Sequence, residues 1–264
     1  MKIADLKAQI KSKEMGCKIH YIEEVTSTNT VAKELAMGDE PTGTLVVTDF
    51  QSQGKGRRGR AWVAPKGKDI FMSILLRPAI EPMQASMITL VMGLSVAQAV
   101  KESLSINSQI KWPNDVVVNG KKICGILTEM SASVNGVDYV VIGTGINCNT
   151  RKFVGEGLIH ATSLVLENGE EVARESLLAK VLMAFETNYN KFLETKDLTN
   201  LQIKYNQMLA NKDREVVISG SEADYVGVAR GINERGELLV EDENGEVKAV
   251  FTGEVSVCGV YGYV

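Results

Sequence analysis

The amino-acid sequence predicts an α+β protein, with a mixed or antiparallel sheet that carries helices and a small β-barrel after it. Strand-like apolar runs alternate with helical runs as far as about residue 211, and two-residue turns join the later strands of this region. Residues 212–264 contain only short strands. At 264 residues the chain can bury a sizeable core and still form a small second domain.

The composition is that of a soluble globular protein. Apolar residues make up 44% and charged residues 23%, and the formal net charge is −4. Domains that bind nucleic acid are normally basic, so we expect no nucleic-acid partner. The N-terminus has no apolar leader, and the longest apolar stretch, Met87–Val100, is short for a bilayer span and contains polar residues. These features predict a cytoplasmic protein without a membrane segment.

Cysteine and histidine are too sparse for a metal centre or a disulfide framework. The sequence has four cysteines and two histidines, and no Cys-x-x-Cys pair. A reducing compartment is therefore expected. His20 lies in a strand-like run and His160 in an irregular stretch, so we predict structural roles for both.

The N-terminal part is predicted to begin with a helix over 3–13. The four polar residues Thr26-Ser27-Thr28-Asn29 precede a helical run at 30–37. One of them should cap that helix, which leaves the other hydroxyl and amide groups free to bind a ligand. The remaining elements expected in this part are strands at 18–25, 43–50 and 69–77, and a buried helix at 83–104.

Turn signals organise the middle of the chain into a meander. Asn119-Gly120 and Asn135-Gly136 are typical two-residue hairpin turns. Because such turns join antiparallel neighbours, Gly143-Thr144-Gly145 lacks the strand–helix context of a dinucleotide fingerprint. The elements expected around these turns are strands at 116–118, 122–130 and 139–146, followed by helices at 176–193 and 199–209.

The expected secondary structure changes near Asn211, from long strands and helices to short strands. We divide it there into a short helical extension (1–17), a larger ligand-binding domain (18–211) and a small barrel (212–264). The short strands expected in the barrel lie at 215–219, 225–232, 237–241, 247–251 and 255–258.

One stretch, Gln51–Trp62, concentrates positive charge. Lys55, Arg57, Arg58 and Arg60 alternate there with glycines, in a loop held between two predicted strands. Glycine permits close backbone approach to a ligand, and arginine provides fixed donor forks for carboxylate and phosphate. The sequence has no Walker A spacing. The loop could be solvated, could bind the phosphates of a nucleotide, or could contact a nucleic-acid backbone. Because the positive charge is confined to this loop while the chain as a whole is acidic, a small anion is the favoured ligand. The fixed ends also suit a lid.

Four motifs occur together in one order: Ser27-Thr28-Asn29, the Gly-Lys-Gly-Arg-Arg-Gly-Arg-x-Trp loop at 54–62, Lys-Trp-Pro-Asn-Asp at 111–115 and Gly-x-Gly-Ile-Asn at 143–147. From about residue 18 to its end, the chain closely resembles the biotin protein ligases, in the form that lacks an N-terminal DNA-binding domain. The resemblance implies a class II synthetase-like sheet and an SH3-like C-terminal barrel.

The resemblance also implies a two-step reaction. Biotin and MgATP would give biotinyl-5′-AMP and pyrophosphate, and a lysine of a biotin carboxyl carrier domain would then take the biotinyl group from AMP. Both steps bring anionic groups together, which suits a dense set of guanidinium groups in a water-excluding site.

The resemblance assigns residue roles by motif. Lys122, Asp115 and Arg57 would be catalytic, with Asp115 positioning Mg²⁺ or the incoming amine; no motif provides a metal site by itself. The residues implied to bind biotin are Ser27, Thr28, Asn29, Gln51, Gly54, Arg57, Arg58, Lys122 and Gly125, of which Gly125 would leave room for the biotin chain. Those implied to bind ATP or the adenylate are Lys55, Arg57, Arg58, Arg60, Trp62, Asn114, Lys122 and Asn147. We expect Trp112 to be mainly structural and Lys121 to be solvated.

Two residues depart from the family's pattern. Lys55 stands where many members have arginine, and Cys258 stands where an arginine is expected near the C-terminus. The alternatives that remain are a lipoate or octanoate ligase, a non-catalytic nucleic-acid-binding module and a non-catalytic biotin sensor. Ser27, Thr28 and Gln51 favour a ureido head over a dithiolane. About 17 residues precede the first strand, so operator binding is not expected; a homodimer stays open.

Overall fold

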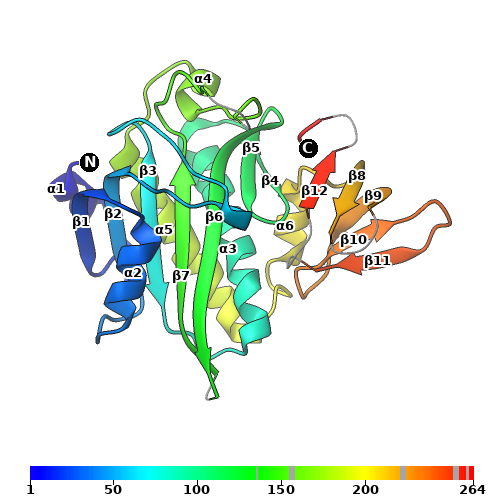
Figure 1. Ribbon diagram of the computed structural model, residues 1–264, viewed down its shortest axis with the longest axis horizontal. Coiled ribbons are helices and arrows are strands. Elements are labelled where there is room, and N and C mark those ends of the chain that lie inside the picture. The colour runs from blue at the N-terminus through cyan, green and yellow to red at the C-terminus, as the bar shows by residue number, and fades with distance from the viewer. Residues whose placement is uncertain (135, 155–157, 221–223, 252–255, 260–261) are drawn as a thin grey trace.

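The computed structural model describes residues 1–134, 136–154, 158–220, 224–251, 256–259 and 262–264. They form a large sheet with helices on both of its faces and a smaller sheet beside it that contains the C-terminal strands (Figure 1). The α+β class predicted from the sequence is confirmed.

The large sheet has seven strands in the order β1-β2-β3-β7-β6-β5-β4. Only the β1–β2 pair is parallel, and the other pairings in this sheet are antiparallel, so the sheet is mixed. The strands are β1 (Ile19–Val25), β2 (Thr44–Gln51), β3 (Ile70–Leu76), β4 (Ser108–Lys111), β5 (Asp115–Val118), β6 (Lys121–Ser133) and β7 (Gly136–Ile146). The hairpin turn predicted between β5 and β6 is present, with positive φ at both Asn119 and Gly120.

Helices cover both faces of this sheet. On one face α3 (Ala85–Leu104) packs against α5 (Arg174–Thr195). On the other, α2 (Thr28–Ala36) packs Ala32 and Ala36 against side chains of β2, β3 and β7. The 82–104 segment is long and apolar enough to cross a membrane, but 78% of its most apolar window is buried in the protein. It is therefore a core helix, as predicted.

The shorter helices connect these layers. They are α1 (Ile3–Gln9), α4 (Leu164–Asn168), α6 (Gln202–Met208) and the 3-10 turns η1 (Arg57–Gly59) and η2 (Pro82–Gln84). Helix α1 is shorter than the predicted 3–13 because the backbone becomes extended at Ile10.

The C-terminal sheet has five antiparallel strands in the order β11-β10-β9-β8-β12. They are β8 (Arg214–Ser219), β9 (Tyr225–Ile232), β10 (Leu238–Glu241), β11 (Val247–Val250) and β12 (Ser256–Gly259), close to the predicted positions. Trp112 links the two sheets: it is fully buried, its backbone N–H donates to Asn211 Oδ1 (3.0 Å), and its indole N–H donates to the carbonyl of Gly236 (3.0 Å). The structural role predicted for Trp112 is confirmed.

The predicted side-chain cap of the second helix is wrong. Helix α2 starts at Thr28 rather than at residue 30, and Ser27 takes the N-cap position without a side-chain capping hydrogen bond. Gln51 of the neighbouring strand supplies the acceptor instead, because its Oε1 takes the Thr28 backbone N–H at 2.8 Å. Strand β6 also runs further than predicted, to Ser133, and Asn135 of the second predicted turn lies outside the described residues.

Candidate active site

Two adjoining cavities contain nearly all of the residues singled out in the sequence. The first, which we call the polar cavity, has a volume of about 50 Å³. The second, the inter-sheet cavity, has a volume of about 210 Å³ and lies between the large and the C-terminal sheets. Both are lined by Gly56, Arg57, Trp62, Asn114 and Lys122. Of the predicted residues, Ser27, Thr28, Asn29, Gln51, Lys55 and Gly125 line only the polar cavity, and Arg58, Arg60, Asp115 and Asn147 only the inter-sheet cavity.

A hydrogen-bond network fixes the inner end of the polar cavity. Gln51 Oε1 accepts from the backbone N–H (2.8 Å) and the hydroxyl (3.1 Å) of Thr28. The Ser73 hydroxyl lies 2.7 Å from Thr28 Oγ1 and 2.6 Å from Asn29 Oδ1. Asn29 Nδ2 donates to a Glu129 carboxylate oxygen at 2.7 Å, and that residue also pairs with Lys33 at 2.7 Å. These contacts hold the side chains in place before any ligand binds.

Two polar groups of this cavity have no partner among the described residues. They are the Trp62 indole N–H and the Thr144 hydroxyl, both buried. Leaving a buried polar group without a hydrogen bond costs about 1–3 kcal/mol, so these groups mark where a polar ligand would bind. The cavity is too small for a biotin-sized ligand in this state, since one water occupies about 10–15 Å³ by this kind of measure.

The basic loop folds as a short hairpin over the cavities. The Gly56 N–H donates to the Arg60 carbonyl at 2.7 Å, and the Trp62 N–H donates to the Gly54 carbonyl at 2.8 Å. Gly54, which lines neither cavity, is required by this turn: a Cβ there would lie 2.4 Å from the Trp62 carbonyl oxygen. The function of the loop as a lid stays a prediction.

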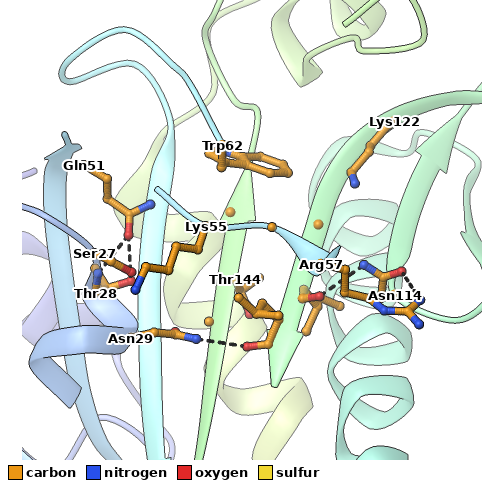
Figure 2. Close-up of a pocket in the computed structure, with 16 residues that line it drawn as sticks. Ser27, Thr28, Asn29, Gln51, Lys55, Arg57, Trp62, Asn114, Lys122 and Thr144 are labelled. Atoms are coloured by element: carbon orange, nitrogen blue, oxygen red, sulfur yellow. Dashed lines mark hydrogen bonds between the residues drawn. The ribbon is translucent and has the colours of Figure 1, made fainter. Parts of the chain in front are cut away.

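Trp62 lies over a floor of glycines. A Cβ on Gly125 would come within 2.5 Å of the Trp62 ring, and one on Gly145 within 2.7 Å. The space above Gly125, predicted for the biotin chain, is filled by the indole here. Figure 2 shows Gln51, Ser27 and Thr28 on one side of the cavity, Arg57, Asn114 and Lys122 on the other, and Trp62 between them.

Arg57 is anchored where the two cavities meet. Its Nη1 donates to Asn114 Oδ1 at 3.3 Å, and Asn114 Nδ2 donates to the carbonyl of Ile126 at 3.2 Å. Burial lowers the pKa of Arg57, and the charges of Arg58 and Arg60 lower it further. The guanidinium remains a cation at neutral pH because its ordinary pKa is so high. This crowding of like charges favours binding of an anion.

Lys122 and Asp115 form an ion pair at the same junction. Lys122 Nζ lies 2.6 Å from Asp115 Oδ1 and 5.4 Å from the Trp62 ring centroid. Asp115 Oδ2 accepts a hydrogen bond from the phenol of Tyr263. On the described part of the inter-sheet cavity wall, Asp115 is the only acidic side chain.

The remaining predicted residues lie at the edge of the inter-sheet cavity. Asn147 lines this cavity, and its Nδ2 donates to the carbonyl of Thr162 at 2.9 Å, which fixes its side chain. Cys258 is exposed on β12 and lines this cavity, so a thiol stands where the resemblance implied arginine. Lys121 is exposed, as predicted.

Three residues near these cavities were missed in the sequence. Ser73 is a buried polar residue in the otherwise apolar run of β3, a signal that could have found it. Glu129 and Tyr263 carry no such signal, because strand pairing and the return of the chain end bring them to the site.

The residues present suit Mg²⁺ held mainly by substrate phosphates. Across the described residues no group of three or more His, Cys, Asp or Glu side chains could hold a metal ion. Mg²⁺ usually keeps several waters and binds through one or two carboxylates together with phosphates. Asp115 can provide one carboxylate, so the cavity fits such an ion only together with a nucleotide.

Comparisons with known proteins agree with this geometry. The profile of the Biotin/lipoate A/B protein ligase family matches residues 21–147, and that of the Biotin protein ligase C terminal domain matches residues 213–257. The bifunctional ligase/repressor BirA of Bacillus subtilis is 34% identical over 96% of this chain and 78% of its own length. The biotin–[acetyl-CoA-carboxylase] ligase of Paracoccus denitrificans is 30% identical over 83% of this chain and 92% of its own.

A solved structure has a similar fold over most of the chain. The biotin protein ligase of Aquifex aeolicus, in complex with biotin and ATP, superposes with a TM-score of 0.80 at 32% identity, covering 92% of this chain and 99% of that one. An α+β ligase with a small C-terminal sheet is thus the class that the fold and cavities define. The chain belongs to the biotin protein ligase family.

Proposed function

We propose that this chain is an ATP-dependent ligase that activates biotin as biotinyl-5′-AMP and transfers the biotinyl group to a lysine of a biotin carboxyl carrier domain. The observation that carries this proposal is the junction of the two cavities. A polar cavity suited to a ureido head opens beside a cationic cavity suited to phosphates, and Arg57 and Lys122 line both.

In the first step a biotin carboxylate oxygen attacks the α-phosphorus of ATP. A phosphorus–oxygen bond forms to the carboxylate, and the bond to pyrophosphate breaks. Negative charge accumulates on the α-phosphate oxygens, and cations held in place beforehand stabilise that charge. Arg57 and Lys122 are the two cations positioned at the junction, so we assign them this role. Mg²⁺ would neutralise the departing pyrophosphate, with Asp115 as the available carboxylate.

In the second step the carrier lysine attacks the acyl carbonyl of the adenylate. A carbon–nitrogen bond forms, the bond to AMP breaks, and the amine loses a proton. A free lysine has a pKa of about 10.4, so a nearby carboxylate helps to hold the amine and accept that proton. Asp115 is buried at the cavity wall and is our candidate for this role.

The binding roles follow the cavities. Ser27, Thr28, Asn29, Gln51 and Gly125 would contact biotin, with Gly54 shaping the turn above them. We assign the phosphates, ribose and adenine to Lys55, Arg57, Arg58, Arg60, Trp62, Asn114, Lys122 and Asn147. We also propose that 18–211 and 212–264 are the two domains, preceded by the 1–17 extension.

We infer the partner from the reaction and from the relatives. The Paracoccus denitrificans protein is named for acetyl-CoA carboxylase, so a carboxylase carrier domain is the partner that we propose. The low overall charge supports the absence of a nucleic-acid partner, and the burial of the apolar 82–104 segment supports a cytoplasmic protein without a membrane contact. Homodimer formation remains a hypothesis for sedimentation analysis.

The proposal is tested by the intact mass of a purified apo carrier domain. The carrier is incubated with this protein and MgATP, and with either biotin or lipoate. A mass gain of one amide-linked biotin, with none from lipoate, is expected. Modification by lipoate alone would move the chain to the lipoate branch of the matched family. If neither acid is attached and biotin releases no pyrophosphate, the ligase assignment fails and a non-catalytic biotin sensor takes its place.

A further inference from the structure

The inter-sheet cavity has a wall residue that neither the motifs nor the proposed reaction accounts for. Tyr263, next to the last residue of the chain, lines this cavity. Its ring stacks on His160, with ring centroids 5.1 Å apart and an interplanar angle of 17°. Lys111 Nζ lies 4.1 Å from the centroid of the same ring and donates to the carbonyl of Val257 at 2.9 Å. The phenol is thus held from several sides.

The phenol and Lys122 hold the two oxygens of one carboxylate. Tyr263 donates to Asp115 Oδ2, and Lys122 Nζ lies 2.6 Å from Asp115 Oδ1. A carboxylate bound at only one oxygen can turn about its last torsion, whereas one bound at both oxygens is fixed in plane and direction. Fixing Asp115 also fixes the position of the Lys122 ammonium, because the two are in direct contact.

The surroundings keep this phenol protonated. Burial raises the pKa of Tyr263 well above its ordinary value, and the charge and hydrogen bond of Asp115 raise it further. The other titratable groups that face it are Lys111 on β4, Lys122 on β6, Arg60 in the basic loop, Cys258 on β12 and the stacked His160. Tyr263 therefore remains a hydrogen-bond donor throughout the pH range in which such an enzyme would work.

We propose that Tyr263 is a positioning residue of the ligase reaction, which holds Asp115 in its ion pair with Lys122 at the junction of the cavities. The inference rests on the proposed function. It assigns a part in the chemistry to the C-terminal segment, which follows the last strand of the smaller sheet. Tyr263 does not line the polar cavity, so its role concerns the rate of the chemical steps and not the affinity for biotin.

The test compares two Tyr→Phe variants of the full chain. Tyr263→Phe removes the phenol oxygen and keeps the ring that stacks on His160. Tyr139→Phe is the matched control, because Tyr139 packs on the α2 face of the large sheet, outside both cavities. The kcat of biotin-dependent pyrophosphate release is measured, together with the Kd for biotin and the melting temperature. These measurements separate chemistry, binding and folding.

For Tyr263→Phe we expect kcat about 10- to 100-fold lower, as for loss of one hydrogen bond to a charged group, with the biotin Kd and melting temperature close to wild type. Tyr139→Phe should match the wild type in every measurement. Tyr263→Ala, which also loses the ring, should be slower than Tyr263→Phe.

Several results would overturn the inference. A Tyr263→Phe enzyme with the wild-type kcat would show that the phenol does not position Asp115. A faster enzyme would show that the phenol must leave Asp115 before turnover. A lower kcat that comes with a lower melting temperature and a weaker biotin Kd would show that Tyr263 only contributes to packing. Absence of pyrophosphate release by the wild type is a separate outcome, which contradicts the proposed function itself.

Discussion

The two cavities differ in how far they are assembled before a ligand arrives. In the polar cavity Ser27, Thr28 and Asn29 are each less than 5% exposed, and hydrogen bonds to Gln51 and Ser73 hold Thr28 and Asn29. Around the inter-sheet cavity the basic loop is largely exposed at Arg58 and Arg60. The wall of the polar cavity is held by hydrogen bonds before a ligand binds, although the cavity must widen to admit biotin. The inter-sheet cavity instead gathers charges from several segments of the chain.

This difference matches the two tasks of a ligase. A ureido group offers fixed donors and acceptors, and a rigid complementary pocket binds it with little ordering cost. Charge on a phosphate changes during the reaction, so groups near the reacting atoms contribute most when they favour the transition state over the substrate. Mutations in the two regions should therefore affect different kinetic constants.

The largest effect is expected for Lys122→Ala. Removal of a cation at the junction should lower kcat for adenylation by about 10²–10³, as for other preorganised groups that stabilise developing charge. The biotin KM should change much less. Biotin-dependent pyrophosphate release measures both constants, and Lys121→Ala, an exposed neighbour, is the matched control. A fall of less than tenfold would remove Lys122 from the chemistry.

Gln51→Ala should affect binding instead. The Thr28 N–H and hydroxyl would lose their acceptor, so we expect the biotin KM or Kd to rise about 10- to 50-fold, a cost of about 1.4–2.3 kcal/mol, with kcat nearly unchanged. Isothermal titration calorimetry measures this change. Gln53→Ala, at an exposed position two residues later, should bind as the wild type does. An equal loss in kcat would show that the polar cavity does not act in binding alone.

Gly125→Ala tests the position of Trp62, which lines both cavities. The new Cβ would meet the Trp62 ring at 2.5 Å, so the indole must leave its glycine floor. We expect about a tenfold loss in kcat/KM, with little change in melting temperature. Gly38→Ala is the control, since its Cβ would meet nothing closer than 3.6 Å. Unchanged kcat/KM in Gly125→Ala would show that the position of Trp62 does not matter.

The smallest effect concerns a carboxylate on β2, two residues before Gln51. Burial raises the pKa of Asp49, but hydrogen bonds from the N-terminal amine, Arg174 and Tyr21 outweigh burial and lower it to about 2, from 3.8. A lowered pKa stabilises the fold above the unfolded value, and this contribution is lost as pH falls from about 4 to about 2.

Asp49→Asn should therefore lower the melting temperature at pH 7 by about 2–4 °C, as expected for about 1 kcal/mol in a chain of this size. The difference should disappear near pH 2, and biotin affinity should stay the same. Thermal unfolding at several pH values measures the change, with Asp39→Asn as an exposed control. A difference that persists at pH 2 would show that the ionised carboxylate is not its source.

From the sequence we predicted the charged residues of the inter-sheet cavity but only some of the residues around the polar cavity. Arg57 and Asp115 belong to short motifs whose chemistry is visible in the sequence, and Lys122, which lies outside those motifs, was assigned from the family resemblance; all three line the inter-sheet cavity. Ser73 reaches the polar cavity through the pairing of β3 with β2 and β7, which places it opposite Val46 and Gly143. Local patterns do not encode such a register, although a serine in an apolar strand is a signal.

The capping error has the same origin. Four polar residues before a helix predict a local cap, but the acceptor for the first helical turn comes from Gln51, which is 23 residues away from Thr28 in the sequence. Tyr263 lies 148 residues from Asp115, so only the folded chain brings them together. Short-range patterns thus predicted the elements and the charged groups, while the contacts between distant segments came from the structure.

The motif Lys-Trp-Pro-Asn-Asp divides its contacts between the two sheets. Lys111 and Trp112 bind backbone carbonyls of Val257 and Gly236 in the C-terminal part, whereas Asn114 and Asp115 contact Arg57 and Lys122. These five consecutive residues therefore contact both the C-terminal sheet and the residues that we propose act on the substrates. In a chimera that exchanges the C-terminal sheet for that of a relative, the contacts of Lys111 and Trp112 with that sheet must be rebuilt without disturbing Asn114 and Asp115 beside them. The two parts of this protein are therefore separable in sequence but not interchangeable as modules.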